Sequence, residues 1–243
     1  MKITSLIKNI AASEHRYPDE VFSLPGRTYT CVNSYAYLFA RKDIPLYDRM
    51  DGIFVDGMWL CKFLRIFWGK KITRRSFDMT SMARDLFERL NAPDNNQSIY
   101  FLGSRPEQVK AATELFARSY PGMKIAGCRD GYFKSDEERI GAARAIVSLT
   151  PDFAIIGMGK PAQEQFACLL REQGFKGIIF TCGGFLHQST QKLHYYPKWI
   201  DRMNLRAFYR FYKEGTWIRL FYDLFRFPPL FIFDTLSSKL SKK

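Results

Sequence analysis

The chain has 243 residues, of which 47% are hydrophobic and 16% aromatic, so it is long enough to bury a core and is unlike a disordered segment. Its formal net charge of +13 indicates an anionic partner: a phosphate-rich substrate, a nucleic acid or an acidic membrane surface. No apolar stretch is long enough for a signal peptide or a spanning helix, so we expect a protein that is neither exported nor integral to a membrane.

After a lead-in over about residues 1–27, short apolar runs alternate with amphipathic runs. The predicted strands cover residues 28–32, 52–55, 98–102, 123–126, 153–156 and 177–181. The predicted helices cover residues 34–41, 79–90, 107–120, 137–149 and 162–171. Strand, short turn and helix in repetition are typical of a parallel sheet with crossover helices. We therefore expect an α/β domain over residues 1–190, with a Rossmann-like, mostly parallel sheet.

The residues that follow these strands are the first candidates for a binding site, because ligands of such sheets bind beyond the carboxyl ends of the strands. These ends carry Asn33, Asp56, Gly103, Gly157 and Gly183. The turns over residues 103–106 and 157–161 each open a helix, whose N-terminus favours an anion. Neither turn matches a P-loop or a dinucleotide fingerprint, and ordinary tight turns fit them as well. With a basic chain, two such turns favour a nucleotide or diphosphate ligand.

Three kinds of side chain near these turns suggest chemistry. Asp56 is placed to act as a general base, although a helix N-cap fits it equally well. His187 is placed to act as an acid, a base or a phosphate donor, or simply as a satisfied histidine at a helix start. Without an Asp-x-Asp pair for a metal ion, Arg74, Arg75 and arginines of the tail are candidates to neutralise a leaving diphosphate. A solvated charge cluster is the alternative for these arginines.

Cysteine spacing gives no support for a metal centre. The five cysteines show no paired spacing, and the three histidines lie apart from them. The sequence thus predicts neither a metal site nor a cofactor. An odd number of cysteines among apolar neighbours indicates reduced, buried thiols of the cytosol.

The C-terminal residues 191–243 differ in composition from the rest. They hold 11 Lys and Arg against 4 acids, a net charge of +7, with aromatic residues in between. This composition is typical of a helical appendage that associates with a membrane surface. Binding of single-stranded nucleic acid, or a helix that packs its aromatics into the core, is equally compatible with it. For an appendage of the first kind, the domain before it should fold without it.

Several segments, in their order and spacing over about residues 28–220, resemble the WecG/TagA/CpsF family, glycosyltransferase family twenty-six. They include Val55-Asp56-Gly57, Leu102 to Pro106, Asp130 to Phe133, Gly157 to Glu164, Cys182-Gly183-Gly184 and Pro197-Lys198-Trp199.

The resemblance implies an inverting, metal-independent transferase that moves a glucose or N-acetylmannosamine type of sugar from a UDP-sugar to a saccharide on polyprenyl diphosphate. It also implies that the protein takes part in the synthesis of a cell-surface polysaccharide, and that it is cytoplasmic and peripheral on the inner membrane. In the reaction that the resemblance implies, Asp56 is the base. Residues and resemblance together give these candidates for substrate binding: Asn33, Gly103, Ser104, Arg105, Asp130, Gly131, Tyr132, Gly157, Gly159, Lys160, Gln163, Glu164, Gly183, Gly184, Arg74, Arg75, Arg206 and Arg210.

The sequence departs from the family pattern at three places. Cys31 stands where many members have Thr, and Ser76 replaces the Gly of an Arg-x-x-Gly-x-Asp stretch. His187 follows Leu186 where members often carry Phe-Asp, so we hypothesise that His187 contacts the sugar and that the donor is glucose. The alternatives to a transferase are a nucleic-acid-binding module and a non-catalytic membrane protein. We expect no nucleic-acid partner, and a homo-oligomer is compatible with the sequence.

Overall fold

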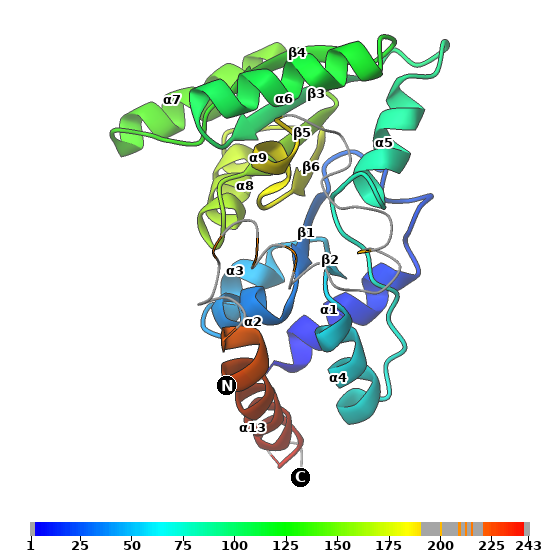
Figure 1. The fold of residues 1–243 in the computed structure, drawn as a ribbon. Coiled ribbons are helices and arrows are strands. Elements are labelled where there is room, and N and C mark those ends of the chain that lie inside the picture. Colours follow the sequence, from blue (N-terminus) through cyan, green and yellow to red (C-terminus); the bar gives the residue numbers. More distant parts are fainter. Residues whose placement is uncertain are drawn as a thin grey trace.

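The structure is a computed structural model that describes residues 3–190 and 221–240, together with Ile200, Tyr209, Tyr212 and Gly215. The described residues form one six-stranded sheet in the order β2-β1-β6-β5-β3-β4, in which every neighbouring pair is parallel (Figure 1). The strands are β1 (Thr28–Val32), β2 (Gly52–Val55), β3 (Ser98–Gly103), β4 (Lys124–Arg129), β5 (Phe153–Gly157) and β6 (Ile178–Thr181). The predicted Rossmann-like sheet is therefore confirmed.

The helices flank this sheet. They are α1 (Thr4–Glu14), α2 (Ser34–Ala40), α3 (Ile44–Asp48), α4 (Met58–Trp68), α5 (Met82–Leu90), α6 (Pro106–Ser119), α7 (Asp136–Leu149), α8 (Ala162–Glu172), α9 (Phe185–Gln188) and α13 (Phe227–Leu240), which follows a π-helical turn, η1 (Tyr222–Arg226). All five predicted helices are present, and their ends differ from the predicted ones by a few residues. The sequence did not predict α1, α3 or α9.

Both faces of the sheet are covered, because successive side chains of a strand point to opposite sides. In β5, Phe153 and Ile155 pack in one core with α5 and α6, whereas Ala154 and Ile156 pack in another with α7 and α8. All four side chains are at most 2% exposed. Burial on both sides explains why the strands read as continuous apolar runs.

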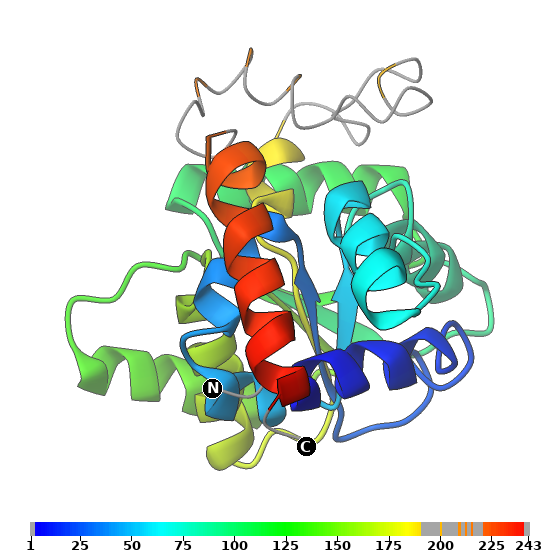
Figure 2. The ribbon, with the colours of Figure 1, turned by 90° about the horizontal axis from the view of Figure 1, so that it is seen from below.

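A third core lies at the β1–β2 edge and joins the two ends of the chain. In it Ile7 and Ile10 of α1 pack with β2, and Phe227 and Phe231 of α13 belong to the same cluster. The lead-in and the last helix are thus parts of the folded domain. Figure 2 shows α13 between α2 and α4.

A buried ion pair fastens α13 to α2. Asp234, only 3% exposed, accepts hydrogen bonds from Arg41 Nε at 2.6 Å and Nη2 at 2.7 Å, and from the Tyr37 hydroxyl at 2.7 Å. Burial and the hydrogen bond to Asp234 raise the pKa of Tyr37 well above its usual value. Among the residues that the structure describes, no helix is long and apolar enough to cross a bilayer.

Candidate active site

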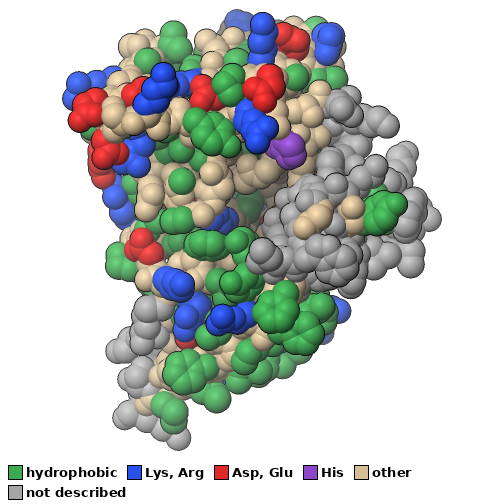
Figure 3. All heavy atoms as spheres, turned by 60° about the vertical axis from the view of Figure 1, so that its left-hand side comes forward, with side chains coloured by type: hydrophobic (Ala, Val, Ile, Leu, Met, Phe, Trp, Pro, Cys, Tyr) green, Lys and Arg blue, Asp and Glu red, His purple; other side chains and the backbone are tan. Residues whose placement is uncertain are grey.

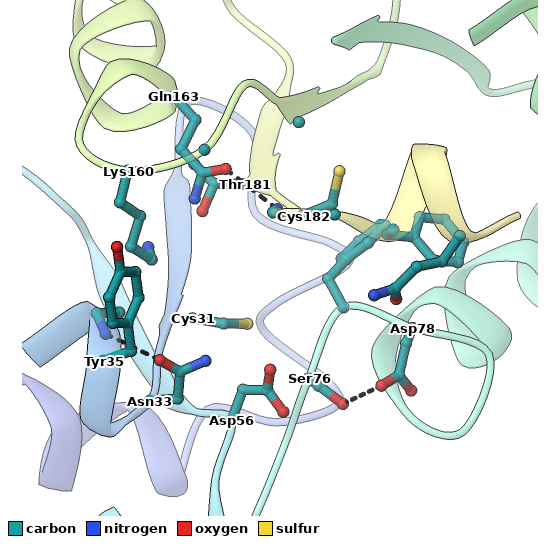
Figure 4. Close-up of a pocket in the computed structure, with 18 of the residues that line it drawn as sticks. Cys31, Asn33, Tyr35, Asp56, Ser76, Asp78, Lys160, Gln163, Thr181 and Cys182 are labelled. Atoms are coloured by element: carbon teal, nitrogen blue, oxygen red, sulfur yellow. Dashed lines mark hydrogen bonds between the residues drawn. The ribbon is translucent and has the colours of Figure 1, made fainter. Parts of the chain in front are cut away.

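A pocket of about 900 Å³ lies at the carboxyl ends of the strands (Figure 4). Side chains or backbone that follow each strand line it: Asn33 after β1, Asp56 after β2, Ser104 after β3, Gly131 after β4, Gly157 at the end of β5 and Cys182 after β6. Parallel strands bring these residues to one edge of the sheet, although they are far apart in the sequence.

Asp56 lies on the pocket wall, with its side chain 34% exposed. Its Oδ1 accepts a hydrogen bond from Arg74 Nη2 at 2.8 Å. Arg74 reaches this position because its segment runs beside β2, where Val55 and Arg74 form an isolated parallel bridge. The N-cap residue of α4 is Gly57, and no side chain caps that helix. The alternative reading of Asp56 as a helix cap is therefore wrong.

Ser76 connects Arg74 to a second carboxylate. Its hydroxyl accepts from Arg74 Nη2 at 3.0 Å and donates to Asp78 Oδ2 at 2.7 Å, and Arg74 lies 3.6 Å from Asp78. The serine that replaces a glycine of the family pattern thus adds a link between the guanidinium and Asp78. Two carboxylates and one hydroxyl fix the orientation of Arg74, and Arg74 in turn fixes Asp56.

Three glycines let the ends of β3, β4 and β5 approach one another. A Cβ on Gly103 would lie 2.2 Å from the carbonyl oxygen of Gly157, and one on Gly131 would lie 3.0 Å from Gly103 Cα. The next residue, Ser104, has a φ of 58°, and its N–H donates to the Gly157 carbonyl at 3.1 Å. A non-glycine residue in the left-handed region is uncommon and is often found at functional sites. The floor of the pocket is therefore formed by backbone at the ends of β3, β4 and β5, where Gly103, Gly131 and Gly157 are in close contact.

Ser104 leads into α6, whose first turn forms part of the pocket. Arg105 is the N-cap residue, and its backbone N–H donates to Gln108 Oε1 at 3.2 Å. Both residues line the pocket. They add a cationic and a polar residue to the lining next to Ser104.

A buried polar cluster lies behind the part of the pocket that Lys160 and Gln163 line. Glu164, which is 0% exposed, accepts hydrogen bonds at Oε1 from Thr30 at 2.7 Å, from Gln163 Nε2 at 2.9 Å and from Lys160. Gln163 Oε1 in turn accepts from the Gly183 N–H at 3.1 Å. Lys160 and Gln163 line the pocket, whereas Glu164 does not. The carboxylate thus holds an ammonium and an amide at the pocket wall rather than facing a ligand itself.

Two pocket thiols are kept protonated by their surroundings. Burial raises the pKa of Cys31 to about 12, and the nearby charge of Asp56 adds to the rise. Burial likewise raises the pKa of Cys182 to about 12. Both thiols line the pocket and stay neutral at physiological pH.

The rim of the pocket is formed by α4, α9, η1 and the turn that follows β4. His187 of α9 lines it and is exposed, as is Tyr132, which is 65% exposed. Trp59 and Lys62 of α4 line the other side, with Lys62 Nζ 5.4 Å from the centre of the Trp59 ring. Asp223 of η1 also lines the pocket, so the C-terminal part of the chain contributes to it.

The pocket brings together most of the predicted site residues. It is lined by Asn33, Asp56, Arg74, Ser104, Arg105, Gly131, Tyr132, Gly157, Gly159, Lys160, Gln163, Gly183, Gly184 and His187.

Four candidates do not line the pocket: Gly103, Asp130, Glu164 and Arg75. Asp130 accepts from the Tyr132 N–H at 2.9 Å, as expected for a turn, and Arg75 lies over the Tyr17 ring and 3.6 Å from Glu14. Arg206 and Arg210 lie outside the described residues.

Sequence reasoning missed several lining residues: Ser34, Tyr35, Trp59, Lys62, Gln108, Thr181, Gln188 and Asp223. Trp59 and Lys62 could have been found, because they lie in the helix that directly follows Asp56. Asp223 could not, because its position depends on the packing of α13. Among the described residues no three His, Cys, Asp or Glu side chains are grouped as metal ligands.

Fold and site together define a parallel α/β protein with a polar pocket at the carboxyl ends of its strands. Four cationic residues line this pocket (Lys62, Arg74, Arg105 and Lys160) against three acidic ones (Asp56, Asp78 and Asp223), a lining that suits an anionic ligand rich in hydroxyls. The model of the WecG/TagA/CpsF glycosyl transferase family matches residues 18–243, and the chain belongs to that family of glycosyltransferases.

Curated relatives agree with this assignment. The chain is 33% identical over 209 residues to a UDP-Gal:alpha-D-GlcNAc-diphosphoundecaprenol beta-1,4-galactosyltransferase of Shigella boydii, a match that covers 85% of this chain and 86% of the relative. It is 26% identical over 190 residues to an N-acetylglucosaminyldiphosphoundecaprenol N-acetyl-beta-D-mannosaminyltransferase of Bacillus subtilis, which covers 76% of this chain and 71% of the relative.

Proposed function

We propose that this glycosyltransferase moves a hexose from a UDP-sugar to a sugar carried on a polyprenyl diphosphate, with inversion at the anomeric carbon and without a metal ion. We place the reaction in the synthesis of a cell-surface polysaccharide, at the cytoplasmic side of the inner membrane. The names of the relatives support an acceptor linked to a lipid diphosphate. The name of the Shigella relative makes UDP-galactose the first donor to test, before UDP-glucose and UDP-N-acetylmannosamine.

The observation that carries this proposal is the carboxylate of Asp56 at the pocket wall, with one oxygen bonded to Arg74. In the proposed reaction, Asp56 takes the proton of an acceptor hydroxyl. The hydroxyl oxygen forms a bond to the anomeric carbon while the bond from that carbon to the diphosphate oxygen breaks, and UDP leaves with the electron pair. A single displacement of this kind inverts the anomeric configuration.

The charge of the departing UDP needs compensation. Lys160 and Arg105 are cationic residues that line the pocket, so they are our candidates for binding the diphosphate. His187 is at the rim, where we assign it a contact to the sugar or the diphosphate. We further propose that residues 191–243 contact the membrane, and that Arg206 and Arg210 reach the active site.

The test is UDP release from wild type and Asp56→Asn, with each donor, a detergent-solubilised N-acetylglucosaminyl-diphosphopolyprenol and a metal chelator. We expect acceptor-dependent release with one donor, and a loss of about 10²–10⁴-fold in Asp56→Asn. Asp94→Asn, at an exposed loop residue, is the matched control and should keep full activity. Equal rates in wild type and Asp56→Asn, or no release with any donor, would refute the proposal.

The role of His187 has a test of its own. His187→Asp restores the residue type that the family pattern often has at this position. If His187 contacts the sugar, the ratio of rates between UDP-galactose and UDP-N-acetylmannosamine should change. An unchanged ratio, with the total rate kept, would exclude His187 from donor selection.

A further inference from the structure

The outward side of α4 carries a stripe of exposed residues that starts at the pocket rim. Trp59 and Lys62 line the pocket, and Ile66 follows on the same side of the helix. Trp59 is 47% exposed and Ile66 71% exposed, and Met58 at the start of the helix is 39% exposed. Large apolar side chains are thus presented to the outside over the full length of α4.

The charge around α4 is of one sign. Residues 57–75 contain six Lys and Arg and no Asp or Glu. Two of the six point inward, since Arg74 pairs with Asp56 and Arg75 with Glu14. The other four are exposed: Lys62, Arg65, Lys70 and Lys71. The outside of this segment is therefore apolar and positively charged.

Helix α13 continues the same type of surface beside α4. Its Phe233, Leu236 and Leu240 are 64%, 56% and 72% exposed. Lys239 joins the two helices through a hydrogen bond from Nζ to the Phe67 carbonyl at 2.9 Å. Figure 3 shows hydrophobic side chains with Lys and Arg among them on the lower part of the molecule, while Asp and Glu gather on the upper part.

Exposed apolar side chains are concentrated here. Of the large hydrophobic side chains that are exposed among the described residues, three lie on α4, three over residues 221–226 and three on α13, against four elsewhere. Tryptophan and aliphatic residues between basic ones are typical of a protein surface that inserts into the headgroup region of an anionic bilayer. Single-stranded nucleic acid is bound by basic grooves with aromatic stacking, a mode that makes no use of the exposed aliphatic side chains of Ile66 and Leu240.

We infer that α4 and α13 form a docking surface for an anionic lipid bilayer, with α4 as the element that turns the pocket rim toward the lipid. This goes beyond a membrane contact by the C-terminal segment, because α4 belongs to the sheet domain and directly follows Asp56. For the proposed function, it means that the polyprenyl chain of the acceptor stays in the bilayer while its sugar reaches the pocket.

The experiment measures binding of the full chain to vesicles of phosphatidylcholine with and without phosphatidylglycerol, in the absence of donor and acceptor. The test variant is Arg65→Glu, Ile66→Ser, Lys70→Glu, none of which lines the pocket. The control makes three matching exchanges, with the same change of charge, at exposed positions of α6 and α7: Lys110→Glu, Arg118→Glu and Leu149→Ser. Circular dichroism checks that both variants are folded.

We expect wild type and control to bind vesicles that contain phosphatidylglycerol. The α4 variant should bind these vesicles with an affinity lower by a factor of about 30 or more. Equal binding of the α4 variant and wild type would overturn the inference, as would equal losses in both variants, which would point to net charge alone. The inference would also be overturned if the wild type did not bind vesicles and instead dimerised through α4. Because no substrate is present, failure of this inference is separate from failure of the proposed transfer.

Discussion

Gly103 occupies a position where the backbones of β3 and β5 leave no room for a side chain. Its φ is 141°, and an added Cβ would lie 2.2 Å from the Gly157 carbonyl oxygen. We expect Gly103→Ala to lower the free energy of unfolding by about 1–3 kcal/mol, because a strand end has to move. Gly141→Ala, in α7 with open space around it, should raise this free energy by about 0.5–1 kcal/mol. Urea denaturation measures both, and equal values for the two variants would contradict the packing argument.

The pocket thiols lead to a prediction about pH. Burial raises the pKa of Cys31 and Cys182 to about 12 from a usual value of 9.0, so both stay protonated where an ordinary thiol ionises. Since the thiolate is the reactive form, iodoacetamide at about pH 8 should label the exposed Cys128 and spare these two. Because the unfolded chain ionises them at lower pH than the folded one, stability should fall as the pH rises from 9 toward 12. Mass spectrometry of labelled peptides checks the first point, and rapid native labelling of Cys31 would contradict it.

At the scale of elements, the ion pair between α13 and α2 is the contact to test. Asp234→Asn leaves the Arg41 guanidinium without its carboxylate in a site where the Asp234 side chain is 4% exposed. Breaking a buried pair from one side should lower the free energy of unfolding by about 3 kcal/mol. The control is Asp136→Asn, whose partner Arg139 is 3.5 Å away and whose side chain is 81% exposed, so little change is expected. Thermal or urea unfolding that affects both variants alike would show that the pair does not anchor α13.

The elements differ in how well the sequence predicts them. All six strands are predicted, because most of them are covered on both faces and are therefore apolar. The exception is the edge strand β4, which includes Lys124 and Arg129 and extends beyond its predicted range of 123–126. The carboxyl ends of the strands place most of the pocket. Helix α1 carries a usable signal in Leu6, Ile7 and Ile10, which share a buried side, but its role in the core depends on contact with β2. Helix α13 has three phenylalanines and one lysine, Lys239, and its apolar residues fit a membrane surface and a core equally well. Only the packing of α13 determines which side chains are buried: Phe227 is in the core and Phe233 is exposed.

The site shows the same division. Asn33 and Asp56 follow strands directly, so topology alone brings them together. Trp59 lies in the helix that directly follows Asp56, so its place near the pocket could have been predicted. Asp223 comes from a helical turn whose placement depends on tertiary contacts, and sequence periodicity contains no information about that placement. Glu164 is a third case, since a carboxylate next to pocket residues looks like a ligand contact until its burial is known.

At the scale of the whole molecule, the two chain ends are parts of one core. Composition suggests that residues 1–190 fold alone, but the structure favours another outcome. A chain that stops at residue 226 loses Phe227 and Phe231 and uncovers Phe63 and Tyr37, which contact them. Since loss of one buried aromatic side chain costs about 3–5 kcal/mol, this chain should aggregate or melt without cooperativity.

The control for this truncation is a chain that stops after Leu240, which keeps all of α13 and should melt like the full chain. Soluble yield and the melting curve by circular dichroism distinguish the two. A cooperative transition near the full-length Tm in the shorter chain would show that α13 is dispensable for folding.

The floor of backbone beneath the pocket limits how this enzyme can acquire new specificities. A Cβ on Gly131 would lie 2.9 Å from Met158 Cγ and one on Gly157 would lie 2.8 Å from Cys182 Sγ, so a substitution at either glycine forces its neighbours to move. Change in the accepted sugar has to come from the walls, where Ser34, Gln108 and His187 have side chains that can vary. A mutant library for altering the product should therefore randomise these wall positions and keep the floor unchanged.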